Sequence, residues 1–225
     1  RWIAFLDADD LWYPNKLEIV YATIEKNPYV AAVCHNEYTR RECEQKKRLI
    51  CHGPYEEDFY KLMLLQGNRV STSAVILRHQ FLKKYNLSFN TKKEFAIVED
   101  YDLWLRISYY GGVFKFIKEP LGEYILQKNN LTSDRIRHNT NRLKLLKEHV
   151  FEFQTFDKNK KRLWMKISTR ISFLYAKEYA SNKKFIEAIK VLIYNFINSP
   201  IYSVLNIYWF IKRKLFLYKT NMMIK

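Results

Sequence analysis

Two groups of carboxylates have the spacing that metal-assisted or acid–base chemistry requires. The first group, Asp7, Asp9 and Asp10, follows an apolar run over residues 2–6. On a strand, Asp7 and Asp9 lie on the same face, because side chains alternate along the chain. Like charges on one face repel each other unless a cation or a ligand carrying one lies between them. The spacing therefore predicts a divalent-cation site where this strand ends.

The second group, Glu99, Asp100 and Asp102, opens an amphipathic pattern that predicts a helix over residues 98–110. The positive end of a helix stabilises carboxylates, and one that faces a pocket can act as a general base. Plain capping with surface charge explains the same residues equally simply. Trp104 lies on the apolar stripe, and Arg106 is placed for an i,i+4 pair with Asp102.

The elements that must position these groups alternate between strands and helices, which indicates an α/β layer fold followed by a helical region. The highly charged residues 39–48 are expected to form a solvated hairpin or loop. Expected helices are residues 15–27, 54–66, 81–85 and 98–110, and expected strands are residues 30–34, 70–77, 113–117 and 121–126, with only helices from about residue 131 onward.

Composition limits the function classes. The 225 residues are 48% hydrophobic, which excludes a disordered chain. The net charge of +16 is concentrated in residues 151–225, which carry fifteen Lys and Arg against four Asp and Glu, so an anionic surface is an expected partner. Three cysteines without zinc or disulfide spacing fit a reducing compartment. No apolar run reaches the roughly 20 residues that a membrane-spanning helix needs.

The C-terminal third has two further apolar patterns of helical spacing. Ile186, Ile189, Leu192 and Ile193 predict the second helix of a hairpin. Residues 201–218 are apolar and aromatic, with a Lys-Arg-Lys cluster at residues 212–214. This segment either lies in a membrane interface, with its cations on anionic headgroups, or packs on the hairpin as a final helix.

The two carboxylate groups together, with the sequence Leu-Trp-Tyr-Pro-Asn-Lys-Leu at residues 11–17, resemble the inverting glycosyltransferases of family 2, which have the GT-A fold. Residues 7–10 match that family's DxD motif, and Glu99-Asp100 with Trp104 and Arg106 matches its ED motif. The resemblance implies a catalytic domain over residues 1–135 and leaves residues 136–225 as a basic helical region. It implies transfer of a sugar from a nucleotide-diphosphate sugar to an acceptor hydroxyl.

The resemblance also implies roles for single residues. Asp7, Asp9 and Asp10 would bind the donor, and Asp9 and Asp7 would hold Mg²⁺ or Mn²⁺. Asp100 would be the general base, with Glu99 in support. The acceptor side would be formed by Ser71, Thr72, Ser73 and Trp104, although Trp104 fits a core position better than a sugar platform.

Departures from the family pattern narrow these expectations. Residues 124–127 lack the basic side chains that reach the diphosphate in many relatives, and the QxxRW signature of processive synthases is absent. The absent signature favours transfer of single sugars. The resemblance implies a hexosyltransferase that acts on a saccharide or lipid-linked acceptor in surface polysaccharide or glycolipid assembly. It also implies a cytoplasmic protein, either free or peripheral on the inner face of the cell membrane. Family members carry a βαβ unit before DxD, so this polypeptide is expected to be truncated and inactive alone.

Two other interpretations remain open at this point. A haloacid-dehalogenase-type phosphatase also begins with a strand and Asp-x-Asp, but Leu11 stands where that family has Thr or Val. A non-catalytic basic module on a membrane or nucleic acid would explain the charged tail. Because no RNA-module signature is present, nucleic acid is not an expected partner.

Overall fold

The computed structural model describes residues 1–127 and 134–223, with only the backbone described at 209 and 213–223. The chain forms two compact units, Arg1–Ser133 and Asp134–Lys225. A helical region was expected from about residue 131, and residues 131–133 lie outside the described residues.

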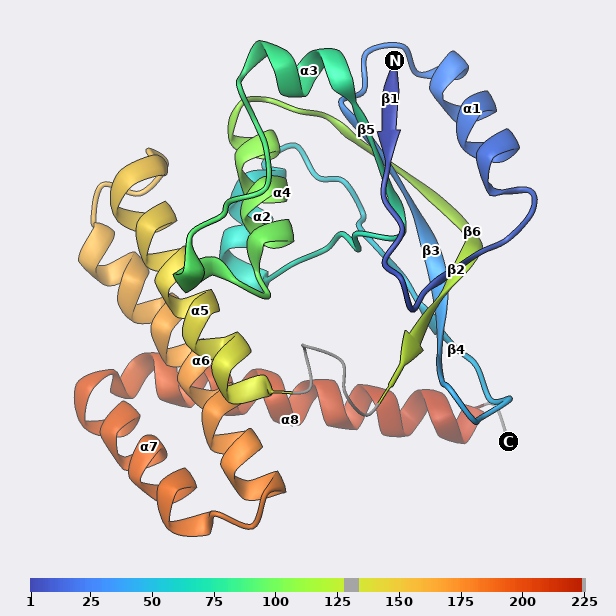
Figure 1. The fold of residues 1–225 in the computed structure, drawn as a ribbon. Helices are drawn as coiled ribbons and strands as arrows, with labels where there is room; N and C mark the ends of the chain where they lie inside the picture. The colour runs from blue at the N-terminus through green and yellow to red at the C-terminus, as the bar shows by residue number, and fades with distance from the viewer. Residues whose placement is uncertain (128–133, 224–225) are drawn as a thin grey trace. The chain divides into compact units, whose positions relative to one another are not determined.

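The first unit contains a six-stranded mixed sheet (Figure 1). Its strand order is β1-β5-β3-β6-β2, with β4 paired to β3. The β3–β6 pair is parallel, and the other pairs are antiparallel. The strands are β1 (Trp2–Ala4), β2 (Leu11–Trp12), β3 (Ala32–Arg41), β4 (Arg48–Ile50), β5 (Val75–Arg78) and β6 (Phe114–Leu126).

Helices cover both faces of this sheet, as α1 lies on one side and α2 and α4 on the other (Figure 1). Val20 and Ile24 of α1 share a buried cluster with Val33, Ile76 and Leu121 of the strands. On the other face an aromatic ring of α2 contacts rings of β6. The helices of this unit are α1 (Lys16–Lys26), α2 (Phe59–Gln66), α3 (His79–Lys84), the short 3-10 helix η1 (Lys93–Phe95) and α4 (Glu99–Tyr109). The expected α/β fold is confirmed.

Three elements differ from the sequence expectation. β3 continues to Arg41, because the hairpin at residues 39–48 extends it against β4. Residues 114–126 form one strand where two were expected, since β6 passes Pro120 with an irregular register opposite Asn36. α2 begins only at Phe59, where the Asp58 side chain accepts a hydrogen bond from the Lys61 backbone N–H and caps the helix.

The second unit is entirely helical over its described residues. Its core is apolar and includes Leu145, Leu163, Ile167 and Ile171. α6 packs against α5, α7 and α8. In the described part of the chain, no helix combines the length and apolar character needed to cross a membrane. The elements are α5 (Arg135–Glu148), the π-helix η3 (His149–Phe153), α6 (Lys160–Ser181), α7 (Phe185–Asn198) and α8 (Pro200–Met223).

A buried carboxylate joins four segments of the first unit. Glu123 of β6 is 3% exposed and accepts hydrogen bonds from Tyr13 Oη at 2.8 Å and from Arg40 Nε at 2.6 Å. Lys47, in the β3–β4 hairpin, forms an ion pair with it. Burial alone would raise the pKa of Glu123, but these bonds, led by that of Lys47, lower the pKa to about 2.

We predict that Glu123→Gln destabilises the protein by about 2 kcal/mol at pH 7, because charge-assisted hydrogen bonds are replaced by neutral ones. The folded pKa lies below the ordinary value of 4.5, so this contribution is complete above pH 4.5 and is lost as the pH falls toward 2. Urea unfolding at several pH values measures it. Glu44→Gln is the control, since Glu44 forms an exposed pair with Arg41 in the same hairpin. An equal loss in both variants would contradict the prediction.

Candidate functional site

One pocket of the first unit, with a volume of about 670 Å³, contains both carboxylate groups. Asp7 and Asp9 reach it from the turn after β1, and Glu99 and Asp100 reach it from the first turn of α4. Segments about ninety residues apart therefore share one cavity. Its other lining residues are Phe5, Leu6, Ala8, Ser71, Thr72, Phe89, Ile97 and Tyr124.

The first acidic group lies in a turn and not on a strand. β1 ends at Ala4, and the Asp10 backbone N–H donates to the Asp7 carbonyl oxygen at 3.1 Å. The expectation that Asp7 and Asp9 share a strand face is therefore wrong, because this i→i+3 bond closes a turn. Both residues line the pocket nonetheless. Partial burial and then the charge of Asp9 raise the pKa of Asp7.

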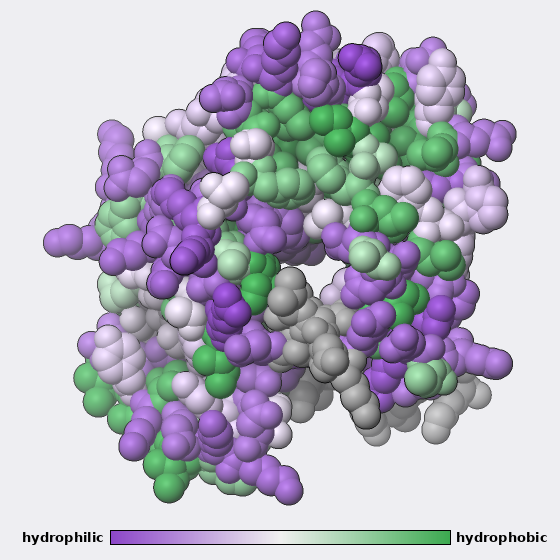
Figure 2. Space-filling view, viewed as in Figure 1, coloured by the Kyte–Doolittle hydropathy of each residue, from purple (hydrophilic) through white to green (hydrophobic). Residues whose placement is uncertain are grey.

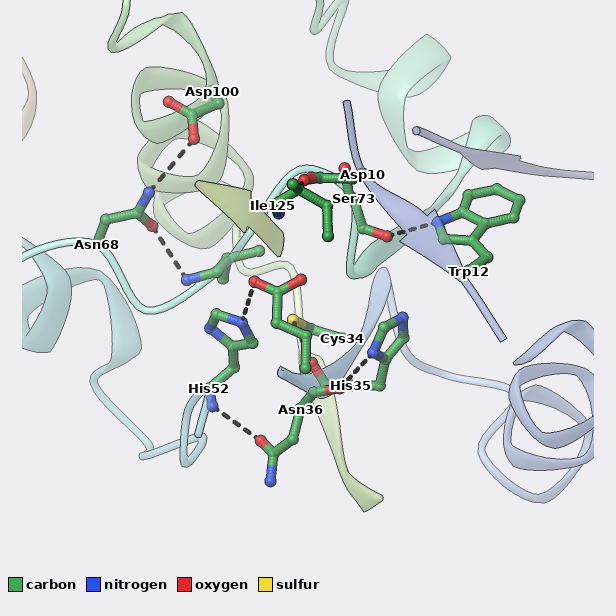
Figure 3. Close-up of polar contacts among 12 residues, drawn as sticks. Asp10, Trp12, Cys34, His35, Asn36, His52, Asn68, Ser73, Asp100 and Ile125 are labelled. Carbon is green, nitrogen blue, oxygen red and sulfur yellow. Dashed lines mark hydrogen bonds and ion pairs between the residues drawn. The ribbon is translucent and has the colours of Figure 1, made fainter. Parts of the chain in front are cut away.

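Asp10, expected to bind the donor, is not among the residues that line the pocket. Its Oδ1 accepts a hydrogen bond from the Ile125 backbone N–H at 3.0 Å (Figure 3). Partial burial raises its pKa to about 6, although the bond from Ile125 opposes the shift. Asp10 thus connects the acidic turn to β6.

Ser73 holds the other side of the same turn. Its Oγ accepts a hydrogen bond from the Asp7 backbone N–H at 3.0 Å. Its carbonyl oxygen accepts from Trp12 Nε1 at 2.9 Å and from Lys16 Nζ at 2.7 Å (Figure 3 labels Ser73 and Trp12). Ser71 and Thr72 line the pocket as expected of the acceptor side, whereas Ser73 is buried and supports the turn instead.

Lys16 is a buried cation to which the sequence interpretation gave no role. Its side chain is fully buried, and Nζ lies 3.7 Å from the centroid of the Trp12 ring. Burial lowers the pKa of Lys16 to about 7, against the opposing effects of Cys34, Glu37 and Asp10. A signal was present in the sequence, because Lys16 lies four residues before Val20 and so falls on the core-facing stripe of α1.

β3 contributes buried polar residues near Lys16, since Glu37 is one of the groups whose charge acts on it. Glu37 Oε1 and His52 Nε2 are 3.1 Å apart, and the His52 backbone N–H donates to Asn36 Oδ1 at 2.9 Å (Figure 3). The charge of Glu37 contributes to the raised pKa values of Asp7 and Asp10. Sequence reasoning missed Glu37, because an acid within a strand resembles an ordinary solvated position.

Asp100 lines the pocket from the first turn of α4. Its Oδ1 accepts a 2.6 Å hydrogen bond from the Tyr101 backbone N–H, and Oδ2 lies 3.4 Å from Asn68 Nδ2 (Figure 3). Burial raises the pKa of Asp100 to about 6, and the charges of Glu99 and Asp7 add to the shift. Because Asp7 acts on Asp100, the two acidic groups share one electrostatic environment.

The segment before α4 is strained. Ile97 has φ = 74°, in the left-handed region that β-branched side chains rarely adopt. Ile97 lines the pocket, and Glu99 and Asp100 follow it within three residues. Glu99 Oε2 is buried and has no hydrogen-bond partner among the described residues. Such strain and unmet polar capacity are typical of functional sites.

Trp104, expected on the acceptor side, is not among the residues that line the pocket. It is fully buried and contacts Phe89 edge-on, with ring centroids 6.2 Å apart. Phe89 in turn contacts Phe5 at 5.3 Å. These two phenylalanines and Tyr124 form an apolar wall of the pocket that sequence reasoning missed. The expected pair is confirmed, since Arg106 Nε donates to Asp102 Oδ2 at 2.8 Å.

The pocket offers oxygen ligands that suit a hard divalent cation, but few of them. No group of three His, Cys, Asp or Glu side chains with metal-site geometry occurs among the described residues. Mg²⁺ is commonly held by one or two carboxylates together with substrate phosphates. Asp7 and Asp9 fit that mode, in which the substrate supplies the remaining ligands.

We predict that Lys16→Met removes a pH dependence of stability. The pKa of Lys16 falls from 10.5 to about 7 on folding, so the unfolded chain binds more protons between these values. The wild type should therefore gain roughly 3 kcal/mol as the pH rises from 7 to 10.5, relative to the variant. Urea unfolding at several pH values tests this, with the exposed Lys26→Met as control. Parallel pH profiles for the wild type and Lys16→Met would refute it.

Comparisons with known proteins agree with this geometry. Residues 1–85 match the family model described as glycosyl transferase family 2. The chain is also 25% identical over 236 residues to a protein of Haemophilus influenzae named an uncharacterized glycosyltransferase, covering 100% of this chain and 69% of that relative. The matched segment includes the acidic turn, Lys16 and Ser73. This chain is therefore similar to glycosyl transferase family 2 over residues 1–85, and to that glycosyltransferase over its whole length.

Proposed function

We propose that this protein transfers a single sugar, with inversion, from a nucleotide-diphosphate sugar to an acceptor hydroxyl. The observation that carries the proposal is the shared pocket, in which Asp7 and Asp9 lie together with Glu99 and Asp100. Inverting transfer needs a base for the acceptor and charge stabilisation for the leaving group. The two acidic groups divide these tasks.

Asp100 is the proposed base. The acceptor hydroxyl attacks the anomeric carbon and gives its proton to the Asp100 carboxylate, as the bond from that carbon to the diphosphate breaks. A pKa of about 6 keeps Asp100 ionised at neutral pH and makes it a stronger base than an ordinary aspartate. Glu99 supports it by orienting the acceptor or by repelling the charge of Asp100.

Asp9 and Asp7 are the proposed ligands of Mg²⁺ or Mn²⁺. Such a cation, when bound, neutralises charge on the diphosphate leaving group. The tight turn at residues 7–10 holds both carboxylates at the pocket, and Ser73 and Asp10 anchor it. Because these anchors are buried or half-buried, the turn is preorganised for its ligand.

Ser71, Thr72 and the wall of Phe5, Phe89 and Tyr124 are the proposed contacts of the sugars. Hydroxyls among apolar rings are typical of a pocket that binds a polar ring with apolar faces. A hexose as the transferred sugar, a saccharide or lipid-linked acceptor, and a role in surface polysaccharide or glycolipid assembly are proposed from the family resemblance. A place on the cytoplasmic side of the membrane is proposed on the same ground.

We predict that the transfer rate rises with pH through about 6 and then levels, because Asp100 must be ionised. Asp100→Asn should lower the rate by about 10²–10⁴-fold and abolish this limb. Release of nucleoside diphosphate from a panel of nucleotide-diphosphate sugars, with saccharide acceptors, measures it. Glu18→Gln, on the exposed side of α1, is the control. Retained activity in folded Asp100→Asn would remove Asp100 from the proposed role.

A second prediction concerns the cation. Asp9→Asn should raise the Mn²⁺ concentration needed for half-maximal transfer by roughly ten-fold or more, because a neutral amide is a weaker ligand than a carboxylate. Thermal unfolding should change little, since Asp9 is not one of the anchors of the turn. Titration of activity with Mn²⁺ tests this. An unchanged requirement would argue against a cation at Asp9.

A further inference from the structure

The outward side of α7 is apolar. Ile186, Ile189 and Ile193 belong to the pattern that predicted the second helix of a hairpin, and their exposed fractions are 68%, 55% and 54%. The buried residues of α7 are Ala188 and Asn195, and the helix packs against α6 and α8. The expected helix is present and packs against α6, but most of its large apolar side chains are exposed among the described residues.

The first half of α8 also carries exposed apolar side chains. Only Ser199 separates the two helices, and residues 200–211 include no charged side chain. Ile201, Val204 and Leu205 are exposed there. Figure 2 shows hydrophobic atoms gathered at the edge of the second unit where α7 lies. We call Ile186, Ile189, Ile193, Ile201, Val204 and Leu205 the apolar α7–α8 surface.

Cations border this surface. Lys183 and Lys184 precede α7, Lys190 lies within it, and Lys212 lies in α8; all four are exposed. Glu187 is the one acidic residue between residues 185 and 225. Lys212 also lies 5.9 Å from the Tyr208 ring, so an aromatic side chain and a cation meet at the margin of the surface.

We propose that the apolar α7–α8 surface docks on an anionic lipid bilayer, with α7 and the first half of α8 lying in the plane of the interface. Large exposed apolar surfaces mark interaction sites, and a helix with an apolar side and bordering lysines is typical of interfacial binding. Anionic headgroups attract the lysines, whereas a second copy with the same positive charge would be repelled. The charge therefore favours lipid over self-association.

This inference goes beyond sugar transfer and would hold if the chain transferred no sugar. It differs from the interpretation of the tail alone, because half of the six residues that define the docking surface come from α7.

The experiment is co-sedimentation of the full chain with vesicles of phosphatidylcholine alone or mixed with phosphatidylglycerol. The wild type should bind the mixed vesicles more tightly, and added salt should weaken binding. The double variant Ile189→Asp/Ile193→Asp should bind these vesicles at least about ten-fold more weakly, because it loses two apolar side chains that enter the bilayer on binding. Tyr29→Asp, an equally exposed apolar position in the first unit, should bind as the wild type does.

A charge variant separates the two contributions. Lys183→Gln/Lys184→Gln/Lys190→Gln should lose the preference for phosphatidylglycerol and most of the salt dependence, while keeping the wild-type melting temperature. Failure of the wild type to bind mixed vesicles, or equal binding by a folded Ile189→Asp/Ile193→Asp variant, would overturn the proposal. The proposal would also be overturned if sedimentation velocity showed that the wild type is a dimer and that Ile189→Asp/Ile193→Asp is a monomer, with vesicles leaving the wild-type dimer unchanged. None of these outcomes depends on transfer activity.

Discussion

The hydrogen bonds that meet at Ser73 fix the site to the sheet. Its hydroxyl holds the Asp7 backbone, and its carbonyl oxygen accepts from Lys16 and Trp12. Ser73 lies two residues before β5, while its partners Asp7, Trp12 and Lys16 come from the β1–β2 turn, from β2 and from the start of α1. One buried residue therefore sets the position of the acidic turn relative to the strand and the helix that flank it.

Several carboxylates lie in or next to the pocket, and burying their charges lowers the free energy of unfolding. Asp7, Asp10 and Asp100 all have raised pKa values, and burial is the largest cause for each. Lys16 is buried nearby, and it forms no ion pair among the described residues. Its burial lowers its pKa. Burial in this site makes the ionised forms of these side chains less favourable and so lowers the stability of the fold. Such a loss of stability in exchange for a preorganised site is typical of enzymes.

The sequence was sufficient to predict the fold class, the helices α1, α3 and α4, and the pairing of Asp102 with Arg106, because these depend on local periodicity and spacing. It was insufficient wherever distant segments decide the outcome. Ser73 looked like a pocket residue because its neighbours Ser71 and Thr72 are, and the direction of its side chain depends on the turn at Asp7. The outward side of α7 could not be foreseen either, since its apolar spacing is the same for a core and for an exposed face.

β6 contributes differently at three successive positions. Glu123 binds the cations of the β3–β4 hairpin, Tyr124 lines the pocket, and the Ile125 backbone holds Asp10. Because side chains alternate along a strand, inserting or deleting one residue before Glu123 would turn the carboxylate toward the pocket and the tyrosine toward the hairpin. Length changes are therefore far less acceptable in β6 than in the exposed hairpin, and homologues should vary in loop length while keeping the length of this strand.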